Sequence, residues 1–268
     1  MSKRTALITG ASAGIGKALA PLFARDGHDV ILVARGRERL EQLAAELTML
    51  HGVQAHVIVA DLGDPRAPVA IFEEVRERGL SVDFLVNNAG FGSNGAFLEQ
   101  PLPREAEMVE VNCTALLQLS HLFGGPMRQR GFGRILNIAS TAGFQPGPFM
   151  ATYYASKAFV ISFSEALAHE LKGTGVTVTC HCPGATHTEF AGKAGNDKSR
   201  LFQRSGIPSA EEVAAHAYGA MMRGEVLAVH GMLNALMVFG VRFSPRGMVR
   251  AMAAQVNQPP RRLPGKAE

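Results

Sequence analysis

Residues 5–16 read TALITGASAGIG, and this stretch decides the fold. Its first five residues are an apolar run that predicts a short buried strand, and the apolar spacing after residue 16 predicts a helix. A strand, a glycine-rich turn and a helix in this order form a site where the backbone can approach a pyrophosphate at the helix N-terminus. A plain tight turn is the alternative. The glycines of the turn are Gly10, Gly14 and Gly16.

The end of the next expected strand, Val30 to Val33, indicates which dinucleotide would bind. An acidic residue near this point holds the ribose 2′-hydroxyl of NAD. Here the chain continues with Ala34 and Arg35 and has no acid. A guanidinium attracts a 2′-phosphate, so Arg35 favours NADP. The alternative is an exposed arginine at the start of the following helix.

Strands and helices alternate along the rest of the chain, which predicts an α/β fold with a doubly wound parallel sheet of the Rossmann-like kind. We expect a single catalytic domain over residues 1–230 with a helical lid at about 188–208, and a C-terminal helical extension with a flexible end over 231–268. The further strands are expected at 53–60, 82–86, 134–139 and 176–182, and the helices at 37–50, 65–78, 104–130 and 153–172.

Polar or turn-forming residues directly follow successive expected strands. In open parallel sheets, ligands bind in the crevice beyond the carboxyl ends of the strands. The sequence therefore predicts one site at this edge of the sheet. These residues are Asp61, Asn87, Asn88, Ser140, Pro183 and Gly184, in addition to the glycine turn.

Tyr153 and Lys157 lie four residues apart, so on a helix they share one face. A lysine cation near a phenol favours the phenolate and lowers the pKa of the tyrosine. The pair is thus a candidate proton donor and acceptor. The alternative is a chance pairing on a helix surface.

Composition limits the other classes of function. The 268 residues are 47% hydrophobic and 19% charged with a formal net charge of +4, and no basic run with interleaved aromatics indicates nucleic-acid binding. Three cysteines do not suggest a disulfide framework. The N-terminus leads directly into a strand without a signal peptide, and the longest uncharged run, 226–241, is too short to span a membrane. We expect a cytoplasmic protein.

These motifs together resemble the single-domain short-chain dehydrogenase/reductase family over about residues 4–230. The resemblance implies that Tyr153 exchanges the proton of the reacting oxygen, that Ser140 holds this oxygen, and that Lys157 lowers the tyrosine pKa and binds the nicotinamide ribose. Asn112 matches the position that supports a water-linked proton relay, although a helix-kink asparagine is the alternative. Tyr154 does not match, because only Tyr153 lies four residues before Lys157.

The resemblance also implies an NADP(H) site and no metal. Where NADP-preferring members often carry a basic residue before the second glycine of the turn, this chain has Ala13, so the 2′-phosphate would depend mainly on Arg35. Besides Tyr153 and Lys157, the implied cofactor-binding residues are Gly10, Ser12, Gly14, Ile15, Gly16, Arg35, Asp61, Leu62, Asn88, Ala89, Gly90, Pro183, Gly184, Thr186 and Thr188.

The sequence therefore predicts an NADPH-dependent reductase of an apolar ketone such as a 3-oxoacyl thioester. A steroid or other hydrophobic alcohol dehydrogenase is an alternative within the enzymes. A non-catalytic NADP-binding regulatory protein is an alternative of another class, and the presence of Ser140, Tyr153 and Lys157 argues against it. The resemblance implies a homodimer or homotetramer formed by the two long helices that contain Asn112 and Tyr153.

Two further segments need an interpretation. Cys180, His181 and Cys182 do not have zinc-site spacing, and a strand points His181 away from both cysteines. In the resembled family a lid over the substrate follows Pro183 and Gly184, and here Gly192, Gly195 and Asn196 would provide its hinges. The apolar residues after Thr188 suggest a hydrophobic substrate, and they are Phe190, Leu201, Phe202, Met232, Leu233, Leu236, Met237 and Phe239.

In the C-terminal extension, Ser244 is expected to cap a helix with Pro245 as its first residue. Met248, Val249, Met252 and Val256 are expected to share one face of that helix, and arginines recur every four residues from Arg242. The extension either packs on the domain or a partner subunit, or contacts a membrane or an acyl carrier.

Overall fold

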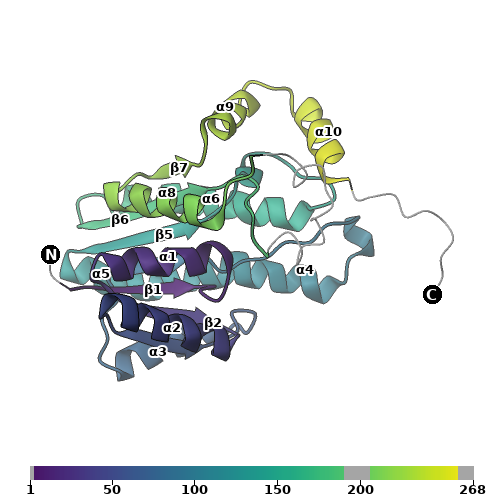
Figure 1. The fold of residues 1–268 in the computed structure, drawn as a ribbon. Coiled ribbons are helices and arrows are strands. Elements are labelled where there is room, and N and C mark those ends of the chain that lie inside the picture. Colours follow the sequence, from purple (N-terminus) through teal and green to yellow (C-terminus); the bar gives the residue numbers. More distant parts are fainter. Residues whose placement is uncertain (1–2, 190–205, 259–268) are drawn as a thin grey trace, which may run out of the picture.

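The computed structural model describes residues 3–189 and 206–258 (Figure 1). The proposed lid residues Phe190 and Leu201 with Phe202, and the hinges Gly192, Gly195 and Asn196, lie outside the described residues. The described chain contains a central sheet with helices on both faces, and two C-terminal helices, α9 (Met232–Val241) and α10 (Arg246–Asn257), at its periphery (Figure 1).

Seven parallel strands form one sheet in the order β3-β2-β1-β4-β5-β6-β7. The strand order reverses between β1 and β4, which is where doubly wound sheets bind ligands. The expected doubly wound fold is confirmed, although β7 was not anticipated because it is only three residues long. The strands are β1 (Thr5–Thr9), β2 (Asp29–Ala34), β3 (Ala55–Val59), β4 (Phe84–Asn87), β5 (Gly133–Ile138), β6 (Val176–Cys182) and β7 (Leu227–Val229).

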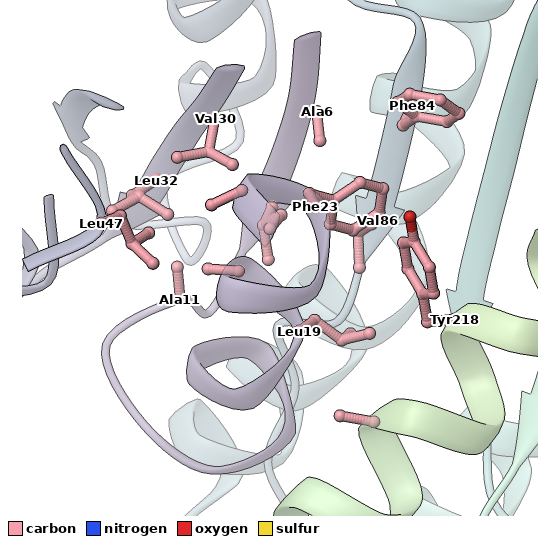
Figure 2. Close-up of a cluster of buried hydrophobic side chains, with 14 of the residues drawn as sticks. Ala6, Ala11, Leu19, Phe23, Val30, Leu32, Leu47, Phe84, Val86 and Tyr218 are labelled. Atoms are coloured by element: carbon pink, nitrogen blue, oxygen red, sulfur yellow. The ribbon is translucent and has the colours of Figure 1, made fainter. Parts of the chain in front are cut away.

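Two apolar layers attach the helices to the sheet. On one face, α1 (Gly14–Arg25), α2 (Arg37–His51) and α8 (Ala210–Arg223) pack around Phe23, which contacts Phe84 and the edge of Tyr218 (Figure 2). On the other face lie α3 (Ala67–Glu77), α5 (Ala115–Arg130) and α6 (Ala151–Glu170). Because Phe23 is fully buried, truncating it to alanine would cost about 3–5 kcal/mol.

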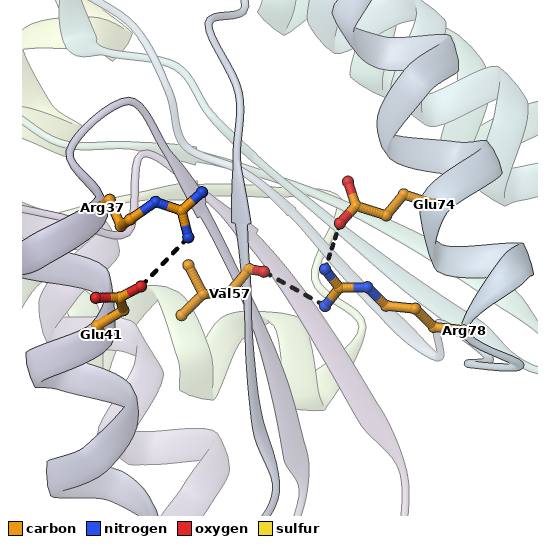
Figure 3. Close-up of polar contacts among 5 residues, drawn as sticks. All are labelled: Arg37, Glu41, Val57, Glu74 and Arg78. Atoms are coloured by element: carbon orange, nitrogen blue, oxygen red, sulfur yellow. Dashed lines mark hydrogen bonds and ion pairs between the residues drawn. The ribbon is translucent and has the colours of Figure 1, made fainter.

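Charged side chains lie beside β3, which is one of the two edge strands of the sheet. Arg78 donates to the carbonyl of Val57 at 3.3 Å and also pairs with Glu74, while Arg37 pairs with Glu41 nearby (Figure 3). An unpaired backbone carbonyl on an edge strand can pair with a strand of another molecule, and charged side chains at the edge disfavour such pairing.

The helix expected over 104–130 is interrupted. It consists of α4 (Leu102–Val109), a π-helical turn (Glu110–Thr114) and α5, and Asn112 lies in the π turn. The prediction of an uninterrupted helix was wrong, because the Asn112 side chain bonds to the Phe91 backbone of a neighbouring loop where the helix changes to a π turn. Single π turns inside helices are frequent at functional sites.

The C-terminal extension differs from the expectation in two details. After α9 (Met232–Val241), helix α10 begins at Arg246 rather than Pro245, and the Ser244 hydroxyl donates to the carbonyl of Gly240 at 2.9 Å instead of capping α10. Along the expected common face, Val249 is buried while Met248 and Met252 are exposed, so only part of this face packs on the protein. Within the described part of the chain, no helix is both long and apolar enough to cross a bilayer.

Candidate active site

The ends of β1 and β4 are joined by the side chain of Thr9. Its hydroxyl donates to the carbonyl of Val86 at 3.2 Å and accepts the backbone N–H groups of Asn88 at 3.0 Å and Ala89 at 3.1 Å. The Asn88 amide in turn donates to the Thr9 carbonyl at 2.9 Å. The predicted strand-end residues are therefore brought together at the point where the strand order reverses.

The glycine turn fits closely under Asn88. Gly10 has a φ of 66° and Gly14 a φ of 55°, a region that side-chain-bearing residues seldom adopt. A Cβ on Gly16 would lie 2.4 Å from both the Asn88 amide nitrogen and the Gly10 carbonyl oxygen. A side chain at residue 16 would therefore displace the turn.

The N-terminus of α1 is open to an anion. The residue before the helix is Ala13, which provides no side-chain hydrogen bond, and the first turn of α1 has no acidic residue. The unpaired backbone N–H groups and the positive end of the helix dipole together favour a phosphate at this position. The Ile15 N–H belongs to this first turn, as expected.

Arg35 is exposed at the end of β2 between two carboxylates. Its guanidinium lies 3.7 Å from Asp61 and 3.8 Å from Glu107. The sequence located Arg35 and Asp61 but missed Glu107, which α4 brings in from 72 positions further along the chain. Leu62 packs in the core beside Ile58 rather than presenting its side chain to the site.

A cavity of about 240 Å³ adjoins the glycine turn on the side of α2. Two cations that were not predicted as site residues, Lys17 and Arg39, line this cavity, and Arg39 is paired with Glu189 at 3.1 Å. The series of arginines that begins at residue 35 was the sequence pattern from which Arg39 could have been predicted as part of the site. The other residues that line the cavity are Ser12, Ala13, Gly14, Gln42, Leu43, Glu46 and Glu189.

Tyr153, Lys157 and Ser140 form one cluster at the ends of β5 and α6. The Lys157 ammonium donates to the carbonyl of Ile138 at 2.8 Å and lies 5.8 Å from the centre of the Tyr153 ring. Ser140 is hydrogen-bonded to Tyr153, accepts the Ala142 N–H at 3.1 Å and is buried. The candidate acid, its orienting hydroxyl and its cation are thus adjacent.

Burial sets the acidity of this cluster. It raises the pKa of Tyr153 to about 12, against the smaller opposite effect of the hydrogen bond with Ser140. Burial also lowers the pKa of Lys157 to about 8. The Tyr153 pKa therefore shifts in the direction opposite to the one expected from its lysine neighbour, because loss of solvation around the phenol dominates.

The side chain of Asn112 connects the loop at Phe91 to helix α6. Its amide donates to the carbonyl of Phe91 and to the Ser156 hydroxyl, both at 3.0 Å, and its oxygen accepts the Phe91 N–H at 3.1 Å. Ser156 then donates to the carbonyl of Tyr153 at 2.7 Å. A Cβ on Gly90 would lie 3.0 Å from the Asn112 oxygen and 3.5 Å from the Lys157 nitrogen, so glycine allows this approach.

The segment after β6 borders the same site. The Ser140 hydroxyl donates to the carbonyl of Pro183 at 3.4 Å, and Thr186 donates to the carbonyl of Gly184 at 3.1 Å. The Thr188 methyl lies 3.2 Å from where a Gly14 Cβ would be, so this segment touches the glycine turn.

Asn257, the last residue of α10, holds the C-terminal extension against the active site. Its side-chain oxygen accepts the Tyr154 hydroxyl at 3.2 Å, its amide donates to the carbonyl of Pro148 at 3.2 Å, and its backbone carbonyl accepts the Asn94 amide at 2.8 Å. Asn257 is 1% exposed. The sequence does not predict this role, since no local pattern links a residue to partners more than 100 positions away.

The cysteine and histidine cluster on β6 belongs to the packing of the sheet. Cys180 and Cys182 lie in the apolar layer under α6, and His181 faces the other side, with its Nε2 3.0 Å from His216 Nδ1. The described residues contain no group of three or more histidine, cysteine or acidic side chains placed to hold a metal ion.

Comparison with known families agrees with this geometry. Residues 4–199 match the family described as short chain dehydrogenase, so the chain belongs to the short-chain dehydrogenase family. It is accordingly an oxidoreductase of this family that acts on CH–OH or C=O groups.

Similar proteins include Nodulation protein G of Rhizobium sp. (strain N33), 35% identical over 86% of this chain and 97% of that protein. The very-long-chain 3-oxoacyl-CoA reductase of Anas platyrhynchos is 39% identical over 69% of this chain and 61% of its own length. A solved short-chain dehydrogenase from Sphingobium yanoikuyae in complex with NADPH is 36% identical, with a TM-score of 0.80 over 90% of this chain and 93% of that one.

Proposed function

We propose that this protein is an NADPH-dependent reductase of apolar ketones, with 3-oxoacyl thioesters as the substrate class. The observation that carries the proposal is the adjacency of Tyr153, Ser140 and Lys157 to an uncapped helix N-terminus at the reversal of strand order. A proton donor and a phosphate-binding turn at one sheet edge are the two parts that a hydride transfer from a dinucleotide requires.

The residues of the glycine turn fit a dinucleotide. Gly10, Gly14 and Gly16 leave the backbone free of side chains, and α1 presents its N–H groups without a competing acid. Asn88, Ala89 and Gly90 would border the ribose, and Lys157 would bind the nicotinamide ribose. The segment from Pro183 to Thr188 would hold the nicotinamide side.

Arg35 would bind the 2′-phosphate of NADP. The guanidinium is exposed and already oriented by Asp61 and Glu107 at 3.7–3.8 Å, distances at which the pairs are weak and easily exchanged for a phosphate. Ser12, across the turn, would add a hydroxyl donor. The NADPH complex of the Sphingobium yanoikuyae relative supports this choice of cofactor.

Proton transfer would be performed by Tyr153. When bound, the nicotinamide supplies the hydride. The raised pKa keeps the Tyr153 hydroxyl protonated near neutral pH, which is the form that donates to a carbonyl oxygen. Ser140 would hold that oxygen, and the Lys157 cation would stabilise the phenolate that remains. Asn112, which fixes the turn of α6 through Ser156, would support delivery of the replacement proton through water.

The proposed substrate class has two supports. The side chains beside Tyr153 are largely apolar, since Ala142, Met150 and Tyr154 form one buried cluster with it, and α10 is fastened to this cluster by Asn257. In addition, the relative from Anas platyrhynchos is named as a 3-oxoacyl-CoA reductase.

We also propose that α5 and α6 form the contact of a homodimer or homotetramer. Both helices expose large apolar side chains, Leu117 on α5 and Phe159 on α6, and Phe159 stacks on Phe163 with ring centres 5.8 Å apart. Sedimentation velocity of a Leu117→Gln, Phe159→Gln variant tests this, and an unchanged mass would exclude these helices as the contact.

The function is tested by a turnover screen with NADPH on ketones of graded chain length and on ring ketones. We expect kcat/KM to rise with chain length among 3-oxoacyl thioesters. A preference for ring ketones would favour the steroid alternative. NADPH binding without turnover of any ketone would favour a cofactor-binding regulatory protein.

A further inference from the structure

Helix α9 has the reverse polarity of an ordinary surface helix, because its polar side chain faces the protein and its apolar side chains face outward. Its one polar side chain, Asn234, faces the protein, where it donates to the carbonyl of His230 at 2.8 Å and lies against Gly184. On the opposite side, Met232, Leu236 and Phe239 are 89%, 65% and 59% exposed. A helix that contacts water normally places its polar residues outward.

The apolar face continues beyond the end of α9. Leu233 on α9 and the following Phe243 are also largely exposed and Met237 is about half exposed, and the rings of Phe239 and Phe243 contact each other with centres 5.1 Å apart. Exposed apolar patches of this extent mark interaction sites. We call this set of six residues, 232, 233, 236, 237, 239 and 243, the α9 face.

The charged side chains next to the α9 face are all positive. Arg242, Arg246 and Arg250 follow it and are exposed, and residues 226–258 contain no aspartate or glutamate. The formal net charge of the whole chain is only +4, so this segment concentrates positive charge beside the apolar side chains. An apolar face flanked by arginines is the pattern of helices that lie in the interface of an anionic bilayer.

We propose that the α9 face and its three arginines bind the surface of anionic membranes. The apolar side chains would enter the boundary between headgroups and acyl chains, and the arginines would contact lipid phosphates and carboxylates. In Figure 1, α9 and α10 lie at the periphery of the protein, where their outer side can approach a flat surface. Because α9 packs on β7 and on the turn after Ser140, the membrane would lie close to the active site.

Other occupants fit this surface less well. A second copy related by two-fold symmetry would bring the same arginines toward one another without acidic partners. A protein interface usually makes about one hydrogen bond per 100–200 Å². The α9 face has no side-chain hydrogen-bonding group, whereas a lipid interior requires none.

The test is flotation of the full-length protein with phosphatidylcholine vesicles that do or do not contain phosphatidylserine. It needs no turnover, so its outcome is independent of the proposed reaction. We expect binding to the anionic vesicles, and a loss of about 5-fold for each arginine changed to glutamine, or on the order of 100-fold for Arg242, Arg246 and Arg250 together. The matched control changes Arg76, Arg128 and Lys172, which are also exposed, and should lose much less.

The apolar contribution is tested with Leu236→Gln and Phe239→Gln, each expected to weaken binding by about 10-fold or more. The control is Met49→Gln on α2, which is 78% exposed and outside the α9 face. Failure of the unmodified protein to float with anionic vesicles would overturn the proposal, as would equal losses in both sets of variants. A lower mass of the α9 variants in lipid-free sedimentation would assign the face to a second copy instead.

Discussion

Asn257 gives the sharpest structural prediction, because its side chain fastens α10 to the active site by two hydrogen bonds. Asn257→Leu keeps a similar volume but leaves the Tyr154 hydroxyl and the Pro148 carbonyl without their partner. A buried hydrogen bond contributes about 1 kcal/mol net, so the docking of α10 should weaken by about 2 kcal/mol, or about 30-fold in its equilibrium. The bond from Asn94 goes to the Asn257 backbone and would remain.

Hydrogen exchange of the amides in residues 246–257 measures this directly. We expect exchange in Asn257→Leu to accelerate there by about 30-fold while β1 and β4 keep their protection. Tyr154→Phe is the matched variant, since it removes only one of the two bonds and should give about 5-fold. The KM for long-chain 3-oxoacyl thioesters should rise more than the KM for a small ketone. Unchanged hydrogen exchange in α10, or an equal rise of both KM values, would refute the conclusion that Asn257 holds the C-terminal extension in place.

Three further outcomes follow from the site. Arg35→Asp should lower the preference for NADPH over NADH by about 10- to 100-fold in kcat/KM. An unchanged ratio of the two kcat/KM values would contradict the assignment of Arg35 as the residue that binds the 2′-phosphate. Gly16→Ala should destabilise the fold by about 1–3 kcal/mol and weaken NADPH binding, because its Cβ would meet Asn88, whereas Gly125→Ala, in open space within α5, should be neutral or slightly stabilising in thermal unfolding. Lys157 has a pKa lowered from 10.5 to about 8, so the folded state binds fewer protons than the unfolded state between these values and stability contributed by this group rises with pH across that window. Chemical denaturation should show a gain of roughly 3 kcal/mol from pH 8 to 10.5 relative to Lys157→Met, and a parallel pH dependence of both proteins would contradict the burial of the charge.

The sequence predicted what depends on local pattern. Alternation of apolar runs with helical spacing placed the first six strands, β1 to β6, and parallel pairing then required that their polar ends meet, as Thr9 and Asn88 do. Glycines with positive φ are also a local property, which is why the turn at Gly10 and Gly14 could be recognised.

Features that depend on tertiary packing could not be predicted. The π turn at Asn112 forms because a loop offers the Phe91 backbone to its side chain, and Glu107 reaches Arg35 only after α4 folds across the sheet edge. The apolar residues of α9 were taken to indicate a hydrophobic substrate, but the structure places Met232 and Leu236 on the outer surface. Composition cannot decide which way an apolar helix faces.

The shift of the Tyr153 pKa illustrates the same limit. The spacing to Lys157 gives a cation near the phenol, whereas the extent of burial around the ring is a property of the folded chain. Burial dominates and raises the pKa.

Turnover and NADPH binding by Tyr153→Phe test the central claim most directly. With a 3-oxoacyl thioester as substrate, we expect NADPH oxidation to fall by roughly 10²–10⁴-fold, since the proton donor is lost, while NADPH binding followed by fluorescence stays within a few-fold of the unmodified protein. Tyr154→Phe, the neighbouring control, should retain turnover of a small ketone. Turnover by Tyr153→Phe comparable to that of Tyr154→Phe would contradict the assignment of Tyr153 as the proton donor.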